Sequence, residues 1–152
     1  MAAITLSNGF FFCSGTVIAS EWVVTASHCM YSDSEGTNPL GESTIRVVLG
    51  EHDKTSTTEN TIPRIVIQVS QIIRHPTYTA STSNNDIALL KLATPVDLSV
   101  YTPACLPKNG ANFVGQKAWV YGEQLCLFLW LSLLVCQVGE RHHSEEVSLT
   151  SC

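Results

Sequence analysis

The 152-residue sequence predicts an all-β domain of the sandwich or barrel class. Short runs rich in Val, Ile, Thr and aromatic residues recur along the first 120 residues, and clusters of Gly, Asn, Ser, Thr and Pro separate them. Charged residues make up only 14% of the chain, whereas about 25% is typical of soluble domains. This deficit argues against a disordered chain and against a helix-rich surface held by salt bridges. The length suits one domain with a single core.

Six segments are predicted to be strands. They span residues 10–18, 22–26, 45–49, 64–73, 86–92 and 117–121. In the fourth of them, Ile65, Ile67 and Val69 share one face, because side chains alternate along a strand. The polar stretches 32–43 and 79–85 contain the residues that favour turns, and they are predicted to be loops.

The character of the sequence changes at about residue 123. Residues 125–136 are apolar except for Ser132, without strand alternation, and a polar run follows to the end. Two interpretations are a buried helix and non-native sequence from a retained intron or frameshift, and we favour the second. A membrane anchor formed by 125–138 is a third idea, but a span needs about 20 apolar residues. We therefore expect 123–152 to be a divergent, non-native or disordered tail.

Charge and cysteine content limit the classes of partner. The net charge of −5 argues against nucleic acid. None of the six cysteines forms a CxxC pair and no His/Cys spacing suits zinc, so no structural metal is expected. Disulfides are the better expectation, and they imply an oxidising compartment. The chain nevertheless opens with MAAI, which carries no signal-peptide features.

A histidine and a cysteine follow the apolar segment 22–26. A lone His beside a strand is usually structural. For His28, the positions of Cys13 and Cys29 favour a catalytic role. A bridge between Cys13 and Cys29 would pin the loop that carries the imidazole. A general base must be held within hydrogen-bond reach of its proton donor, so such a bridge would serve function.

An aspartate opens the apolar segment that ends at Leu92. Asp86 entering a buried strand costs free energy unless the carboxylate is paired or hydrogen-bonded. It is therefore either a turn residue that caps the preceding asparagines or a buried carboxylate that accepts from an imidazole N–H.

These two stretches resemble a known family. CSGTVIASEWVVTASHC at 13–29 resembles the catalytic-histidine segment of trypsin- and chymotrypsin-like serine proteases, and NNDIALLKL at 84–92 resembles their catalytic-aspartate segment. Further matches in the family's order are LGEHD at 49–53, IIRHPTY at 72–78, TPACLP at 102–107 and GQKAWVYG at 115–122. Six ordered matches make the resemblance specific. It covers residues 1 to about 122 and nothing after them.

The resemblance implies a fold and a mechanism. Residues 1–122 would form the antiparallel six-stranded Greek-key β-barrel that is the first of the family's two barrels. His28 would take a proton from a serine hydroxyl and pass it to the leaving amine of a polypeptide substrate. Asp86 would fix the His tautomer and stabilise the imidazolium. The parent protein would be an extracellular endopeptidase.

The family's nucleophile does not occur in this sequence. There is no GDSGG string, and the serines after residue 122 have no adjacent glycines. The chain also opens as the interior of the family's early strand would, so Met1 is interpreted as an internal methionine. We expect a fragment truncated at both ends and inactive as written. The alternative is a non-enzymatic pseudoprotease that acts as a binding or regulatory module.

Two smaller expectations concern ligands and partners. Glu51, Asp53 and Glu59 lie in the loop where some trypsins bind calcium, but three acids are few for an ion that takes six to eight oxygens. Cys105 corresponds to a cysteine that bridges to a pro-segment or light chain in related zymogens. A buried free thiol is the alternative for Cys105. No other cofactor and no membrane partner are expected.

Overall fold

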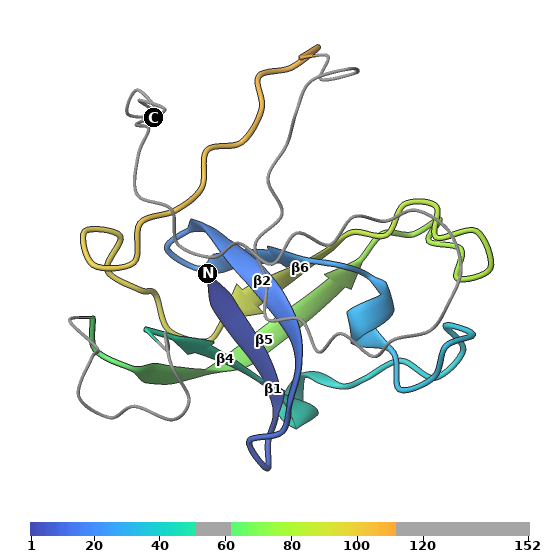
Figure 1. Ribbon diagram of the computed structural model, residues 1–152, viewed down its shortest axis with the longest axis horizontal. Coiled ribbons are helices and arrows are strands. Elements are labelled where there is room, and N and C mark those ends of the chain that lie inside the picture. The colour runs from blue at the N-terminus through green and yellow to red at the C-terminus, as the bar shows by residue number, and fades with distance from the viewer. Residues whose placement is uncertain (51–61, 112–152) are drawn as a thin grey trace, which may run out of the picture. The chain divides into compact units, whose positions relative to one another are not determined.

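The computed structural model of the chain describes residues 1–50 and 62–111 (Figure 1). The strands are β1 (Ala2–Leu6), β2 (Phe11–Ala19), β3 (Trp22–Thr25), β4 (Ile45–Leu49), β5 (Ile65–Arg74) and β6 (Ala88–Leu92). Two single turns of 3-10 helix, η1 (His28–Met30) and η2 (Glu42–Thr44), complete the regular structure in these ranges. No helix in the described part of the chain is long and apolar enough to cross a bilayer.

The six strands form a closed barrel in the order β1-β2-β3-β6-β5-β4. Every neighbouring pair is antiparallel, including the β1–β4 pair that closes the barrel. Because β4 returns to lie beside β1, the first four strands have the Greek-key order β4-β1-β2-β3. The predicted all-β class and the six-stranded antiparallel barrel are confirmed.

The predicted strand list differs from the observed one at its two ends. The list omitted β1, a short strand at the N-terminus with no turn signal before it. It included 117–121, which lies outside the described residues, as does the expected boundary between residues 122 and 123. The two 3-10 turns were not predicted, because three residues are too few to show a periodic pattern.

The core of the barrel is apolar and receives side chains from all six strands. In β6 the alternate residues Ala88, Leu90 and Leu92 are buried. In β5 the alternation predicted for Ile67 and Val69 holds, with Ile65 partly buried. A register shift between Val69 and Gln71 then changes the inward phase, so that Ile72 is the next buried residue.

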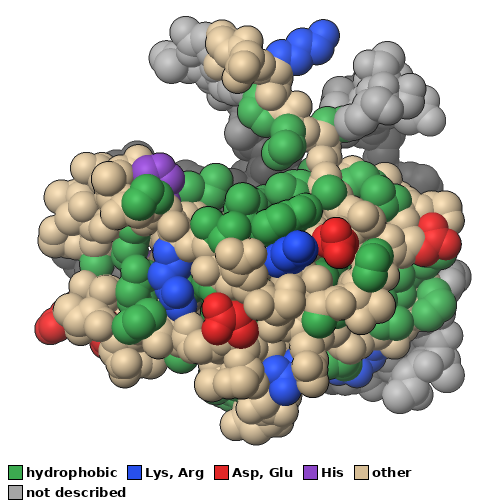
Figure 2. Space-filling view, turned by 180° about the vertical axis from the view of Figure 1, so that it is seen from behind, with side chains coloured by type: hydrophobic (Ala, Val, Ile, Leu, Met, Phe, Trp, Pro, Cys, Tyr) green, Lys and Arg blue, Asp and Glu red, His purple; other side chains and the backbone are tan. Residues whose placement is uncertain are grey.

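The outer surface of the barrel is also partly apolar. Figure 2 shows hydrophobic side chains gathered in a band on the face opposite the view of Figure 1, with a few charged groups among them. Large apolar residues that are exposed include Phe10, Val66, Ile73 and Ile87. This surface agrees with the low charged fraction of the sequence.

Gly50, which follows β4, is expected to tolerate no side chain. Its φ is +76°, and an added Cβ would lie 2.1 Å from the carbonyl oxygen of Pro63. We predict that Gly50→Ala lowers the free energy of unfolding by more than about 1 kcal/mol, because the left-handed backbone alone costs that much and the clash adds to it. Urea unfolding measures the change.

The matched control is Gly41→Ala, since Gly41 has a φ of −86° and an added Cβ would meet nothing within 4 Å. Equal stabilities of the two variants would contradict the prediction.

Candidate active site

Strand register brings together two segments that are 58 residues apart. β3 and β6 are antiparallel with Thr25 opposite Ala88. The same register, continued past the strand ends, would set Ser27 opposite Asp86. The imidazole Nδ1 of His28 lies 2.7 Å from Asp86 Oδ2. The backbone N–H of His28 donates to Asp86 Oδ1 at 2.8 Å, so the carboxylate holds both the ring and the main chain.

Arg74, at the end of β5, hydrogen-bonds the η1 turn that carries His28. The Arg74 guanidinium donates to the carbonyl oxygen of Met30 from Nε at 3.2 Å and from Nη2 at 3.0 Å. Nη2 also donates to the carbonyl of Leu40. The guanidinium carbon lies 5.3 Å from the ring centroid of Tyr31, a cation–π contact. These contacts fix the last carbonyl of η1 against the barrel.

The turn before β6 positions Asp86. Asn85 adopts a left-handed φ of +56°, which Asn tolerates better than most residues. Its Nδ2 donates to the carbonyl oxygen of Thr77 at 3.1 Å and to the Thr77 hydroxyl at 2.9 Å. The backbone N–H of His75 donates to the carbonyl oxygen of Ile87 at 3.1 Å. The residues before and after Asp86, Asn85 and Ile87, are therefore both fixed by hydrogen bonds.

Hydrogen bonding keeps Asp86 ionised. Partial burial raises the pKa of its carboxyl, but hydrogen bonds from the His28 ring, the His28 backbone and the Ser27 backbone, with the charge of His28, hold the pKa below the usual 3.8. At Tyr78, burial first and the nearby Asp86 charge second raise the pKa of the phenol. The His28 side chain is 60% exposed and that of Asp86 25% exposed, so the pair meets solvent.

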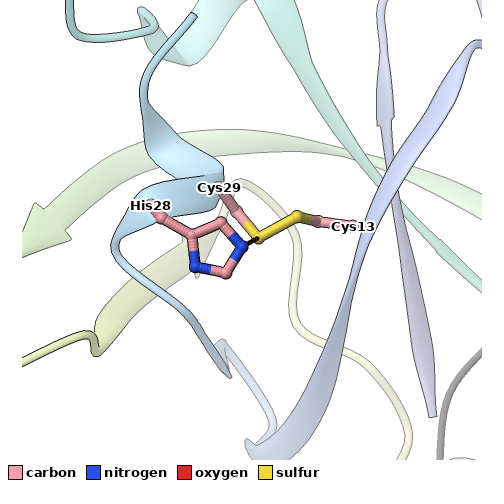
Figure 3. Close-up of side chains that lie close together, drawn as sticks. All are labelled: Cys13, His28 and Cys29. Carbon is pink, nitrogen blue, oxygen red and sulfur yellow. Dashed lines mark hydrogen bonds between the residues drawn. A yellow bond between two sulfur atoms is a disulfide. The ribbon is translucent and has the colours of Figure 1, made fainter. Parts of the chain in front are cut away.

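The other imidazole nitrogen faces sulfur. Cys13 on β2 and Cys29 on η1 form a disulfide bond, with their Cα atoms 6.1 Å apart. The Nε2 atom of His28 lies 3.4 Å from the Sγ of Cys29. Figure 3 shows the His28 ring beside this disulfide, which ties η1 to β2.

Of the other site residues named in the sequence analysis, the structure describes only Cys105. The calcium candidates Glu51, Asp53 and Glu59 are outside the described residues, and so are all serines after residue 122. Cys105 is on an exposed segment and takes part in a disulfide bond. Arg74 was not predicted to support the site, although it lies in the matched string IIRHPTY. Its acceptors are the backbone carbonyls of Met30 and Leu40, which give no signal in the sequence.

The arrangement is suited to proton transfer. A carboxylate that accepts from Nδ1–H leaves Nε2 as the proton acceptor and stabilises the imidazolium after it takes up a proton. This is general acid–base chemistry, and an exposed imidazole is accessible to a reacting group.

The pH dependence of stability tests the environment of Asp86. Because its pKa is lower in the folded chain than the usual 3.8, its ionised form contributes stability above that pH, and the contribution is lost as pH falls through the folded pKa. We predict a smaller loss of stability on acidification in Asp86→Asn than in the wild type. Urea unfolding between pH 6 and about pH 3 measures it.

The control is Asp97→Asn. The pKa of Asp97 is also lowered, but by hydrogen bonds from Ser99 rather than from His28. If Asp86→Asn left the acid dependence unchanged while Asp97→Asn reduced it, the assignment to the His28–Asp86 pair would be wrong.

Comparisons with known proteins agree with this geometry. A family model described as Trypsin matches residues 1–126. Vitamin K-dependent protein C of Mus musculus is 43% identical over 119 residues, which cover 78% of this chain and 23% of that protein. Trypsin II-P29 of Gallus gallus is 38% identical over 120 residues, covering 78% of this chain and 42% of that protein.

A third relative, Serine protease 1 of Rattus norvegicus, is 37% identical over 105 residues, covering 68% of this chain and 37% of that protein. The chain thus spans less than half the length of these relatives. The match to the family model covers most of the chain and includes every described residue. The chain therefore belongs to the trypsin family and corresponds to the N-terminal region of a trypsin-like serine protease.

Proposed function

We propose that this chain supplies the general base and its orienting carboxylate for a serine endopeptidase. The observation that carries the proposal is the 2.7 Å contact between His28 Nδ1 and Asp86 Oδ2. In the reaction, Nε2 takes the proton of a serine hydroxyl as the oxygen attacks the peptide carbonyl. The imidazolium then returns the proton to the leaving amine. Asp86 holds the productive tautomer throughout.

The nucleophile is the part of the mechanism that this chain does not supply in recognisable form. An oxyanion turn needs backbone freedom of the kind glycine provides, and the sequence has no GDSGG string. We therefore propose that the chain by itself does not hydrolyse peptides. Its substrates as part of a complete enzyme are polypeptides, and the Cys13–Cys29 disulfide supports an extracellular location.

A pro-segment or light chain joined through Cys105 remains part of the proposal for the complete protein. Because Cys105 is already disulfide-bonded here, such a link requires exchange of that bond. The pseudoprotease alternative is distinguished by the coding sequence downstream of the Gly122 codon. A GDSGG-encoding exon supports the enzyme, whereas a glycine-rich turn with another residue at the serine position supports the pseudoprotease.

A chimera tests the proposed roles directly. Residues 1–122 of this chain replace the matching segment of Trypsin II-P29, and a fluorogenic peptide reports hydrolysis. We predict an active chimera whose kcat falls at least about 10³-fold in His28→Ala, because the serine then lacks its base. His75→Ala is the matched control and is expected to retain activity, since His75 contacts Thr77 rather than Asp86.

An active-site phosphonate that labels triad serines provides the second measurement. The chimera should be labelled stoichiometrically and the chain alone should not. Labelling of the chain alone would contradict its proposed inactivity. A folded chimera with equal rates in wild type and His28→Ala would contradict the role of His28.

A further inference from the structure

Three side chains of metal-binding types meet beside the barrel. Cys13, His28 and Cys29, which we call the sulfur–imidazole cluster, each offer one ligand atom, two Sγ and one imidazole nitrogen, and these three atoms all lie within 4.8 Å of one another. Cys13 comes from β2, whereas the other two residues come from η1 (Figure 3). Within residues 1–50 and 62–111, no other three His, Cys, Asp or Glu ligands come together in this way.

We propose that reduction of the Cys13–Cys29 disulfide converts the sulfur–imidazole cluster into a Zn²⁺ site of two thiolates and one imidazole. A dithiol or phosphine reductant gives two electrons to the disulfide, whose sulfurs take up two protons. The reductant becomes a disulfide or, with water, a phosphine oxide. Zn²⁺ then displaces the two thiol protons and forms two Zn–S bonds and one Zn–N bond. Two Cys and one His with a water in the fourth position is a known type of zinc coordination.

The distances in the cluster suit a tetrahedral ion. With Zn–S near 2.3 Å and Zn–N near 2.05 Å, a nitrogen and a sulfur on adjacent tetrahedral vertices lie about 3.6 Å apart. His28 Nε2 and Cys29 Sγ are already 3.4 Å apart. The two sulfurs need a separation of about 3.8 Å, and breaking their bond permits it. The Cα atoms of Cys13 and Cys29, 6.1 Å apart, leave room for an ion between the side chains.

Asp86 prepares the imidazole as a ligand. A metal-bound His usually donates its other ring N–H to a carboxylate, which fixes the tautomer and orients the ring. The 2.7 Å contact between Nδ1 and Asp86 Oδ2 provides this interaction and directs the Nε2 lone pair toward Cys29. His28 is also 60% exposed, so an ion can enter from solvent and keep a water as its fourth ligand.

Zinc binding would exclude the proposed catalysis, because both use Nε2. An oxidised chain keeps that nitrogen as a proton acceptor, whereas a reduced, zinc-bound chain holds it as a ligand. The metal site itself does not rest on the proposed function, since it can be measured without any proteolysis.

The test uses the full chain with the other four cysteines, Cys105, Cys126, Cys136 and Cys152, each replaced by Ser. The protein is reduced with a phosphine, which competes weakly for zinc, and is titrated with Co²⁺ as a spectroscopic probe. We expect one Co²⁺ per chain with sulfur-to-cobalt charge transfer and the intense d–d bands of a tetrahedral ion. Zn²⁺ should displace the cobalt, and the oxidised protein should show neither feature.

Variants assign the ligands. His28→Gln should lower the Zn²⁺ affinity at least about tenfold and Asp86→Asn about 10- to 100-fold, as loss of an orienting carboxylate does elsewhere. His75→Gln is the matched control and should leave the affinity unchanged. Circular dichroism follows the β-sheet signal in each reduced sample.

Three outcomes would overturn the proposal. The first is a reduced chain, folded or unfolded, that binds no metal. The second is equal zinc affinity in His28→Gln and the wild type. Two thiolates of an unfolded chain would bind zinc in that way, without the imidazole. The third is equal binding by the oxidised protein.

Discussion

The antiparallel pairing of β3 with β6 is the constraint on which the site depends. Its register sets Thr25 opposite Ala88, so the residues just after one strand lie beside those just before the other. His28 and Asp86 meet for that reason, across 58 residues of sequence. A slip of one residue would reverse the faces of β6, placing Leu90 outside and moving the carboxylate away from the imidazole. The apolar core and the His28–Asp86 contact therefore specify the same register.

The His28–Asp86 contact itself contributes little to that specification. His28 is largely exposed, and an exposed pair is weakened by water and by salt. The geometry is instead imposed by groups around the pair, chiefly Arg74 beneath η1 and Asn85 before Asp86. Two backbone N–H groups add to the ring contact at the carboxylate. The pair is thus positioned by the residues around it, which is the arrangement that the proposed proton transfer needs.

Apolar periodicity and the order of the motifs predicted most of the strand positions. The segment 45–49 matches β4 without error, and the predicted strands at 10–18 and 64–73 are each displaced by one residue from those observed. The strand list omitted β1 because no turn signal precedes its five residues at the N-terminus, although the family resemblance had placed the start of the chain in an early strand. The support from Arg74 could not be predicted, because it joins the end of β5 to carbonyl oxygens of Met30 and Leu40, and backbone acceptors leave no mark in a sequence.

The sequence spacing predicts no structural metal, and our zinc proposal departs from that expectation because of how the fold places the ligands. Ligand motifs space their residues so that the local backbone can turn them toward one ion, and His28 and Cys29 are adjacent, with Cys13 far away. The η1 turn nevertheless brings the His28 ring beside the sulfur of its own neighbour, and β2 supplies the other sulfur. The disulfide beside His28 contains the same two sulfur atoms that, once reduced, would bind zinc in our proposal. Under the two proposals, the oxidation state of this disulfide decides whether Nε2 serves as a base or as a ligand, because one lone pair cannot do both.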